Sequence, residues 1–256
     1  MRGTLYAIEA KTYFFGGISM MEKTIRSFED ILNMLDQKFR APEQFWNPFY
    51  KNRERPVPFF KNAPDENLVS YVEKNLLRLG KVMDLGCGPG RNSLYLAEQG
   101  FDVKGYDISS EAIYWAQERA EERGLRIEFL CKSAFEIDAF EEYEFVYDSG
   151  CLHHLWPHRR IQYLEMIYRS LKPGALFGIS CFRPGFGGQG GPLREMSDWE
   201  VYEEGSMNGG LAFSEEKLRY ILEPYFECIE FRAVEKPDNE EVFGVPFLWG
   251  SLWKKK

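Results

Sequence analysis

A short apolar run that ends in an acid and opens into a glycine-rich loop constrains this chain more than any other feature. Residues 82–92 read V-M-D-L-G-C-G-P-G-R-N, and a helical pattern, Asn92–Gln99, follows at once. This order predicts a strand, a tight turn and a helix N-terminus, where backbone N–H groups approach a ligand closely. Because Arg91 stands where a dinucleotide-binding G-x-G-x-x-G fingerprint needs its third glycine, the loop does not fit that fingerprint.

A second acid, Asp107, ends the next predicted strand. It lies 21 positions after Gly86, close to the offset at which an acid meets the ribose hydroxyls of a bound nucleoside. A carboxylate suits this task because it accepts two hydrogen bonds from a vicinal diol. We expect Asp107 to bind ribose; the alternative is a turn or N-cap residue before the helix Glu111–Arg123.

From Lys81 onward, predicted strands and helices alternate. The strands expected are Lys81–Asp84, Asp102–Tyr106, Arg126–Cys131, Phe145–Tyr147 and Ala175–Cys181; the helices are Asn92–Gln99, Glu111–Arg123 and Arg160–Leu171, with a turn at Lys172–Gly174. The alternation predicts an α/β fold, a doubly wound and mostly parallel sheet with helices on both faces. Since ligands of such sheets bind at the carboxyl ends of strands, residues that follow these ends are expected to line one cleft.

The sequence changes character after Cys181. Residues 183–212 are rich in glycine, acids and aromatic residues, which indicates either a lid over the substrate or a variable surface insertion. A capped helix is expected from Ser214 to Leu222, and Phe226–Val234 and Phe243–Trp253 are expected to form a closing strand pair.

The composition predicts a folded globular domain in which acidic residues outnumber basic ones. The chain has 256 residues, 44% hydrophobic and 16% aromatic, enough for a sizeable core. Its formal charge of −8 disfavours a nucleic-acid partner, and no stretch approaches the ~20 apolar residues of a membrane span. The five scattered cysteines form no C-x-x-C pair, so we expect buried free thiols and a cytoplasmic protein.

Two parts of the chain are expected. Residues 1–40 would form an N-terminal extension, partly dispensable because Met20 and Met21 offer alternative starts, and residues 41–256 a single domain. We expect this domain to act as a monomer or a homodimer.

Several motifs resemble the core of the class I S-adenosylmethionine-dependent methyltransferases. The matching pieces are Asp84–Gly90 (D-L-G-C-G-P-G), Gly105–Ser109 (G-Y-D-I-S), the strand and loop Phe145–His154, and Leu171–Gly174 (L-K-P-G). Upstream, Phe45–Tyr50 is loosely similar to the aromatic segment of the thiopurine and tellurite-resistance branch. The resemblance covers residues 80–181 and implies a Rossmann-like, seven-stranded sheet with a reversed last strand.

The resemblance also implies the cofactor, S-adenosylmethionine, with S-adenosylhomocysteine as product, and a set of binding residues. These are Asp84, Gly86, Cys87, Gly88, Gly90, Arg91, Asp107, Ile108, Ser133, Ala134, Phe135, Asp148 and Ser149. Asp84 would orient the loop or accept from the cofactor's amino group, and Arg91 would meet a carboxylate or a substrate anion, or be solvated. Trp46 and Tyr50 would cover the cofactor or substrate, or pack onto the core.

Two departures from the family pattern bear on the adenine contact and on the kind of methyl acceptor. Ser133 stands where many members have an acid that meets the adenine amino group; its hydroxyl can accept that N–H, and Ala134 can donate from its backbone. The fourth strand ends in D-S-G-C at Asp148–Cys151 without the N-P-P-[YF] sequence that marks methylation of bases and amides. We therefore expect a small-molecule acceptor, methylated on O, N or S.

All three histidines follow the fourth strand, where a methyl acceptor would lie. A near-neutral imidazole at His153 or His154 would serve as a general base; the alternative is that one packs on the sheet and another is exposed. No acid or cysteine stands near them at a metal-ligand spacing, so no metal is expected. Two other functions stay open: a methyltransferase-like protein that binds cofactor without turnover, and a nucleotide-dependent oxidoreductase.

Overall fold

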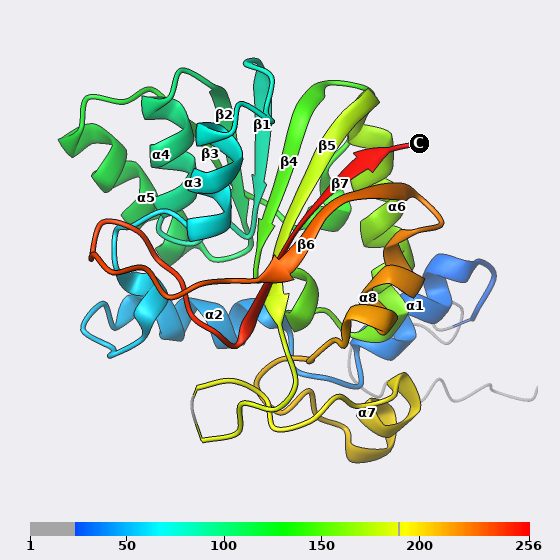
Figure 1. Ribbon diagram of the computed structural model, residues 1–256. Helices are drawn as coiled ribbons and strands as arrows, with labels where there is room; N and C mark the ends of the chain where they lie inside the picture. The colour runs from blue at the N-terminus through cyan, green and yellow to red at the C-terminus, as the bar shows by residue number, and fades with distance from the viewer. Residues whose placement is uncertain (1–23, 189) are drawn as a thin grey trace, which may run out of the picture. The chain divides into compact units, whose positions relative to one another are not determined.

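The computed structural model describes residues 24–188 and 190–256 (Figure 1). The chain divides into two units, residues 1–38 and 39–256. In the first unit, α1 (Phe28–Asp36) begins at a capping box in which the Ser27 hydroxyl accepts from the backbone N–H of the third helical residue. The alternative starts lie outside the described residues, and the dispensable extension stays a prediction.

The second unit is built on a seven-stranded sheet with the order β3-β2-β1-β4-β5-β7-β6. The strands are β1 (Lys81–Leu85), β2 (Asp102–Asp107), β3 (Glu128–Cys131), β4 (Tyr143–Ser149), β5 (Leu171–Phe182), β6 (Phe226–Ala233) and β7 (Leu248–Lys255). Neighbours pair in parallel from β3 to β5, whereas β7 is antiparallel to both β5 and β6. The predicted Rossmann-like, doubly wound sheet with a reversed last strand is confirmed.

Helices cover both faces of this sheet (Figure 1). One face carries α3 (Glu66–Glu73), α4 (Arg91–Glu98) and α5 (Ser110–Glu122), and the other carries α6 (Arg160–Ser170) and α8 (Glu215–Leu222). Strand β4 shows why: Phe145 and Tyr147 pack with α3, while Val146 between them packs with α6. The remaining helices are α2 (Pro42–Lys51), α7 (Asp198–Glu204) and the short turns Pro58–Phe60, Ala134–Glu136, Leu152–His154 and Pro157–Arg159.

Two predicted boundaries are wrong. The expected turn Lys172–Gly174 lies inside β5, as a bulge: Tyr143 pairs with Leu171, and the next pair joins Phe145 to Leu176. Gly174 has φ +71°, which lets the chain make this detour without leaving the sheet.

At the other end of the chain, the last strand begins later than predicted. Strand β7 starts at Leu248, because Phe243 instead forms an isolated bridge to Asp65, just before α3. The connection between β6 and β7 is therefore drawn toward the carboxyl ends of the central strands.

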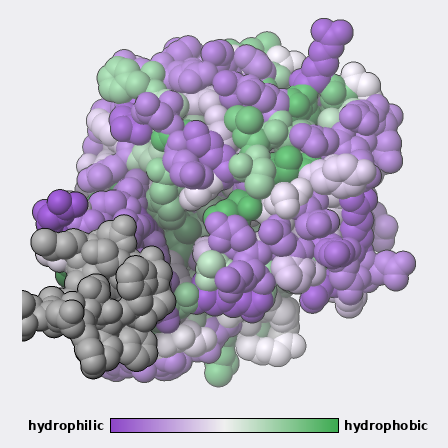
Figure 2. Space-filling model, turned by 180° about the vertical axis from the view of Figure 1, so that it is seen from behind, coloured by the Kyte–Doolittle hydropathy of each residue, from purple (hydrophilic) through white to green (hydrophobic). Residues whose placement is uncertain are grey.

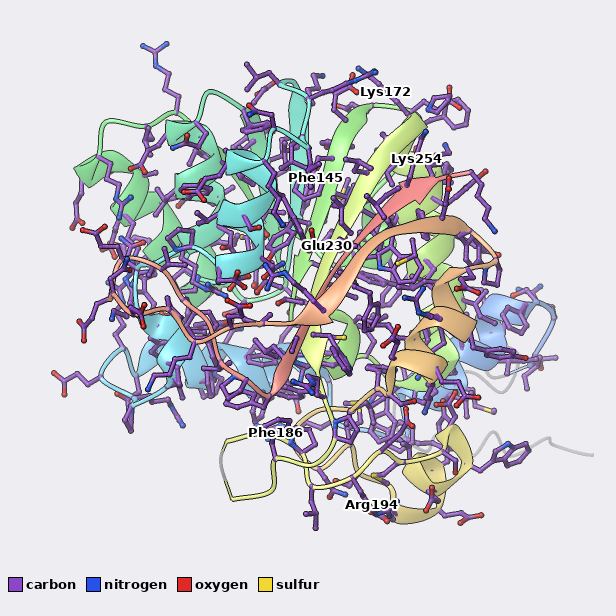
Figure 3. All side chains as sticks on the ribbon, in the orientation of Figure 1. Phe145, Lys172, Phe186, Arg194, Glu230 and Lys254 are labelled. Carbon is purple, nitrogen blue, oxygen red and sulfur yellow. The ribbon has the colours of Figure 1, made fainter. Side chains whose placement is uncertain are left out.

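The segment 183–212 also lies at that end of the sheet. Figure 3 places Phe186 and Arg194 beyond the carboxyl end of β5, far from Lys172 and Lys254 at the opposite end. Within the segment, α7 begins at Ser197, whose hydroxyl accepts from the N–H of Glu200. Residues 183–212 are thus placed near the predicted cleft, and their role as a lid stays a prediction.

The surface is mostly polar on the face seen in Figure 2, where apolar side chains are visible between the polar ones. In the described ranges, no helix is long and apolar enough to cross a bilayer. All five cysteines are free, but only Cys87 and Cys181 are buried as expected. Cys151 and Cys228 are half-buried, and Cys131 is exposed because it ends the edge strand β3.

Candidate active site

The glycine loop between β1 and α4 forms a tight cradle. Gly86, Gly88 and Gly90 have φ of +63°, +54° and +79°, a region in which side-chain-bearing residues are strained. A Cβ on Gly86 would lie 3.1 Å from Cys151 Cβ, and one on Gly88 would lie 3.0 Å from the Tyr50 hydroxyl. The loop therefore exposes backbone rather than side chains, as close approach of a ligand requires.

Asp107 ends β2 directly beside this loop. Its carboxylate accepts from the N–H of Gly88 at 2.9 Å and from the N–H of Ser109 at 2.8 Å, and it lines the cavity described below. Burial raises the pKa of Asp107 to about 6. The turn role holds, but the N-cap of α5 is Ser109, whose hydroxyl accepts from Ala112 N–H. Asp107 keeps lone pairs for further donors.

Three predicted binding residues do not line the cavity. Gly90 is the N-cap of α4, and its position is dictated by packing, since a Cβ there would lie 3.0 Å from Ala116 Cβ. Asp148 is fully buried and accepts from the N–H groups of Cys151 and Leu152, at 2.6 and 3.0 Å. It also accepts from the Tyr163 hydroxyl at 2.8 Å, so it shapes the turn after β4 instead of facing a ligand.

Asp84 is the third residue away from the cavity. One carboxylate oxygen accepts from the Ser93 hydroxyl at 2.6 Å, which ties β1 to α4 and fits the predicted loop-orienting role. The other oxygen, Oδ1, is buried and has no hydrogen-bond partner among the described residues. Burial raises the pKa of Asp84 to about 7.

Arg91 is buried rather than solvated. Its guanidinium forms an ion pair with Asp65, donates to the Ala63 carbonyl and to Ser149 Oγ, and lies 4.5 Å from the centre of the Phe243 ring. The Asp65 carboxylate also accepts from Asn92 and from the Tyr147 hydroxyl, at 3.0 and 2.8 Å. Arg91 thus has its charge compensated where it reaches the cavity wall.

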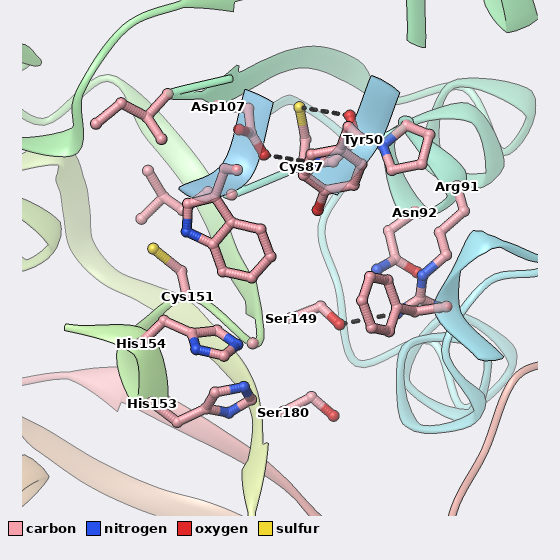
Figure 4. Close-up of a pocket in the computed structure, with 18 of the residues that line it drawn as sticks. Tyr50, Cys87, Arg91, Asn92, Asp107, Ser149, Cys151, His153, His154 and Ser180 are labelled. Atoms are coloured by element: carbon pink, nitrogen blue, oxygen red, sulfur yellow. Dashed lines mark hydrogen bonds between the residues drawn. The ribbon is translucent and has the colours of Figure 1, made fainter. Parts of the chain in front are cut away.

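These elements enclose one cavity of about 470 Å³ at the carboxyl ends of the central strands (Figure 4). One end, here called the glycine end, is formed by residues 86–89 and Asp107. The predicted residues Gly86, Cys87, Gly88, Arg91, Asp107, Ile108, Ser133, Ala134, Phe135 and Ser149 all line this cavity. The structure therefore brings together most of the predicted set.

The other side of the cavity is aromatic. Five rings that all line it follow one another: Trp46, His154, His153, Phe182 and Phe247, here called the aromatic wall. Successive ring centres lie 4.8, 4.4, 3.8 and 6.1 Å apart. Trp46 and Tyr50 come from α2 and line the cavity, and the Tyr50 ring also packs against Phe60, with ring centres 5.6 Å apart.

The two predicted bases lie on this wall with different contacts. His153 is buried, stacks on Phe182 at 11°, and accepts from the Phe182 backbone N–H through Nδ1 at 3.3 Å. His154 is half-buried, and burial lowers its pKa to about 4. The third histidine, His158, lies off the cavity and bonds to the Tyr202 hydroxyl at 2.7 Å. In the described ranges, no group of His, Cys, Asp or Glu side chains is arranged to hold a metal ion.

Two of the features that sequence reasoning missed are Asp65 and the segment that holds Phe243 and Phe247. Asp65 precedes α3 and binds Arg91 at the cavity wall, and Phe243 and Phe247 precede β7 and line the cavity. Neither has a local motif around it. The only signal was the aromatic and apolar character of the segment before the last strand, which was assigned to the strand itself.

Comparison with known proteins finds similarity to methyltransferases. The methyltransferase domain family matches residues 82–174. The 2-heptyl-1-hydroxyquinolin-4(1H)-one methyltransferase of Mycobacteroides abscessus is 30% identical over 161 residues, which are 60% of this chain and 66% of that protein. A probable S-adenosyl-L-methionine-dependent methyltransferase, TehB of Haemophilus influenzae, is 39% identical over 66 residues, 26% of this chain and 23% of that one.

A solved structure extends the likeness to the fold. The 1,6-didemethyltoxoflavin-N1-methyltransferase of Burkholderia thailandensis, solved with 1,6-didemethyltoxoflavin and S-adenosylhomocysteine bound, superimposes with a TM-score of 0.55 at 21% identity, over 91% of this chain and 92% of that one. The chain matches less than two thirds of the length of the curated relatives named above. Fold, glycine loop and matches agree: residues 82–174 match a methyltransferase domain, and the predicted resemblance to the class I S-adenosylmethionine-dependent methyltransferases is confirmed.

Proposed function

We propose that this protein transfers the methyl group of S-adenosylmethionine to an oxygen, nitrogen or sulfur atom of a small molecule. The observation that supports this most is that one cavity joins the glycine end to the aromatic wall. A cofactor at the first and an acceptor at the second would meet inside a single enclosed space. The Mycobacteroides and Burkholderia proteins, whose names specify small-molecule acceptors, support the same class of substrate.

The residues present fit the cofactor. The left-handed glycines leave a cradle that side chains would fill, Asp107 retains acceptor capacity for a ribose diol, and the orphaned Asp84 Oδ1 is an unused acceptor beneath the loop. When bound, the cofactor supplies an activated methyl group on a sulfonium. The acceptor atom would form its bond to the methyl carbon as the S–CH₃ bond breaks, with the electron pair left on sulfur.

The protein's contribution would be alignment and exclusion of water. Holding two reactants in line can lower a barrier by roughly 7–11 kcal/mol. A proton released by the acceptor would pass to His154 or to water; neutral at pH 7, His154 can accept it only briefly because its pKa is about 4. Because alignment lowers the barrier, the proposed transfer does not require a strong general base.

We extend the proposal to the parts around the cavity. Residues 183–212 would cover the acceptor, since Gly190 lines the cavity and the N–H of Leu211 donates to the His153 carbonyl at 2.7 Å. The acidic charge, the free cysteines and the absence of an N-P-P-[YF] sequence favour a cytoplasmic enzyme, monomeric or dimeric, without a nucleic-acid substrate.

Isothermal titration with S-adenosylmethionine, S-adenosylhomocysteine and NADH tests this function. We expect micromolar binding of both sulfur nucleosides and none of NADH. Binding of NADH alone would favour the oxidoreductase, and binding of none would favour a protein that has the fold without the cofactor.

A further inference from the structure

The aromatic wall has no free charge beside it. Only three charged residues line the described cavity: Asp107, Arg91 and Lys132. Asp107 is bound to the glycine loop and Arg91 is paired with Asp65. Lys132 follows β3, and its backbone N–H donates to the Asp107 carbonyl, which places this residue at the glycine end and not at the aromatic wall. A charged acceptor at the wall would lose its hydration without gaining a counter-ion, which is costly.

The wall is also continuous, with rings set at different angles. The His153 and Phe182 rings stack at 3.8 Å, and the His154 and Phe247 rings, inclined at 67° and 54° to their neighbours, extend the row on either side. Gly210 holds the stack from outside, because a Cβ there would lie 2.6 Å from the Phe182 ring. Rings inclined in this way favour a planar aromatic ligand, which they can hold by edge-to-face contacts.

One polar group interrupts this apolar wall. The Nδ1 atom of His153 accepts from the Phe182 N–H, and a neutral imidazole has a single proton, so that proton lies on Nε2. The Nε2 edge lies against Gly150, where a Cβ would be 3.4 Å from it, and Gly150 lines the cavity. Figure 4 shows both imidazoles directed toward Ser149 and Ser180 across the cavity. His153 therefore presents a hydrogen-bond donor, not a base.

We propose that the aromatic wall is the acceptor subsite, and that it takes an uncharged planar aromatic compound with a hydroxyl or carbonyl oxygen, held by the Nε2–H of His153. The inference rests on the proposed function for the identity of the second ligand. It makes His153 a specificity-determining residue that reads an oxygen on the acceptor ring.

The test is titration of the full-length protein saturated with S-adenosylhomocysteine, using three probes. 2-Naphthol has both a flat ring and an oxygen, naphthalene keeps the ring without any hydrogen-bond acceptor, and cyclohexanol keeps the hydroxyl without the flat ring. We expect 2-naphthol to bind about 5–10-fold more tightly than naphthalene, the effect of one hydrogen bond, and at least about 10-fold more tightly than cyclohexanol.

Variants then assign the effect to the residue. His153→Phe keeps a ring for stacking but has no N–H, so we expect it to abolish the preference for 2-naphthol over naphthalene while the Kd of S-adenosylhomocysteine changes by less than about twofold. His153→Gln, which keeps a donor, should restore part of the preference. His158→Asn, off the cavity, is the matched control and should behave as the unmodified protein.

The outcomes separate the two proposals. Binding of S-adenosylhomocysteine without binding of 2-naphthol, or equal binding of 2-naphthol and cyclohexanol, overturns the subsite and leaves the methyltransferase function standing. A preference that survives His153→Phe overturns the role of His153. Failure to bind S-adenosylhomocysteine overturns both, and the probe series on the unmodified protein decides the ring-and-oxygen requirement even where a variant does not fold.

Discussion

The glycine end and the aromatic wall share one cavity but are built in opposite ways. The glycine end comes from two adjacent strand ends, β1 and β2, and its key groups are backbone N–H groups and one carboxylate. The aromatic wall is assembled from α2, the turn after β4, the end of β5 and the connection before β7. The first suits a ligand common to a whole class of enzymes, and the second suits one that differs between members.

Asp65 is the residue that links the two. It pairs with Arg91 at the start of α4, accepts from Tyr147 on β4, and forms a bridge with Phe243 in the segment that supplies Phe247. Asp65 is only 1% exposed, so water cannot replace its carboxylate, and the buried Arg91 guanidinium depends on it for a counter-charge. We therefore expect a change of Asp65 to disturb the packing of the two ends of the cavity against each other more than any other change discussed below.

Removing that carboxylate should have the largest effect. Asp65→Ala leaves the Arg91 guanidinium buried without its partner, so the free energy of unfolding should fall by about 3–5 kcal/mol. Urea unfolding measures this. Asp138→Ala, which removes an almost fully exposed partner of Arg169, is the control and should change it by less than about 1 kcal/mol. A similar small loss in both variants would mean that the buried pair does not hold the two ends together.

The next largest effect should depend on pH. Burial raises the pKa of Asp84 to about 7, so between pH 4 and pH 7 the folded state holds a proton that the unfolded state has lost. Stability from this group therefore falls as pH rises through that window. Asp84→Asn removes this pH dependence because the amide does not titrate. The free energy of unfolding of the variant, relative to that of the unmodified protein, should therefore rise by about 2–3 kcal/mol between pH 5 and pH 8.

Thermal unfolding at the two pH values, without ligand, measures this change. Asp102→Asn, at the exposed start of β2, is the matched control and should show no such growth. An Asp84→Asn effect that is equal at both pH values would contradict a buried, uncompensated carboxylate at the glycine end.

A third change should affect the glycine end alone. Asp107→Ala removes the expected acceptor for two ribose hydroxyls, and we expect affinity for S-adenosylhomocysteine to fall about 30–100-fold. Titration calorimetry measures it, with Asp102→Ala as control on the same strand. Unchanged affinity would remove Asp107 from the cofactor site.

The smallest effect should come from the opposite end. Phe247→Ala removes one ring of the aromatic wall, so 2-naphthol should bind the S-adenosylhomocysteine complex about 5–10-fold more weakly, with cofactor affinity unchanged. Phe140→Ala, an exposed phenylalanine off the cavity, is the control. Equal weakening of both ligands by Phe247→Ala would show that the two ends are not separate subsites.

The same contrast explains what the sequence could predict. The strand order and the residues of the glycine end follow from local patterns: an apolar run, an acid and closely spaced glycines within a few positions of one another. Asp148 shows where prediction from local patterns fails. It ends a strand as Asp107 does, but the turn after β4 folds back and its N–H groups capture the carboxylate.

The aromatic wall could be predicted only in part. His153 and His154 were found because they follow a strand end, but whether an imidazole accepts or donates depends on the Phe182 N–H, which lies 29 positions away. Asp65 and Phe247 were missed because their places are fixed by a bridge between segments more than a hundred residues apart, and no local pattern encodes such a contact.

A crystal structure of the complex with S-adenosylhomocysteine tests the central claim most directly. We predict that the ribose hydroxyls lie on the Asp107 carboxylate and that the sulfur atom faces Gly150 and the aromatic wall, which stays open for an acceptor. An adenine ring stacked on His153 and Phe182, with Asp107 unengaged, would contradict the assignment of the two ends.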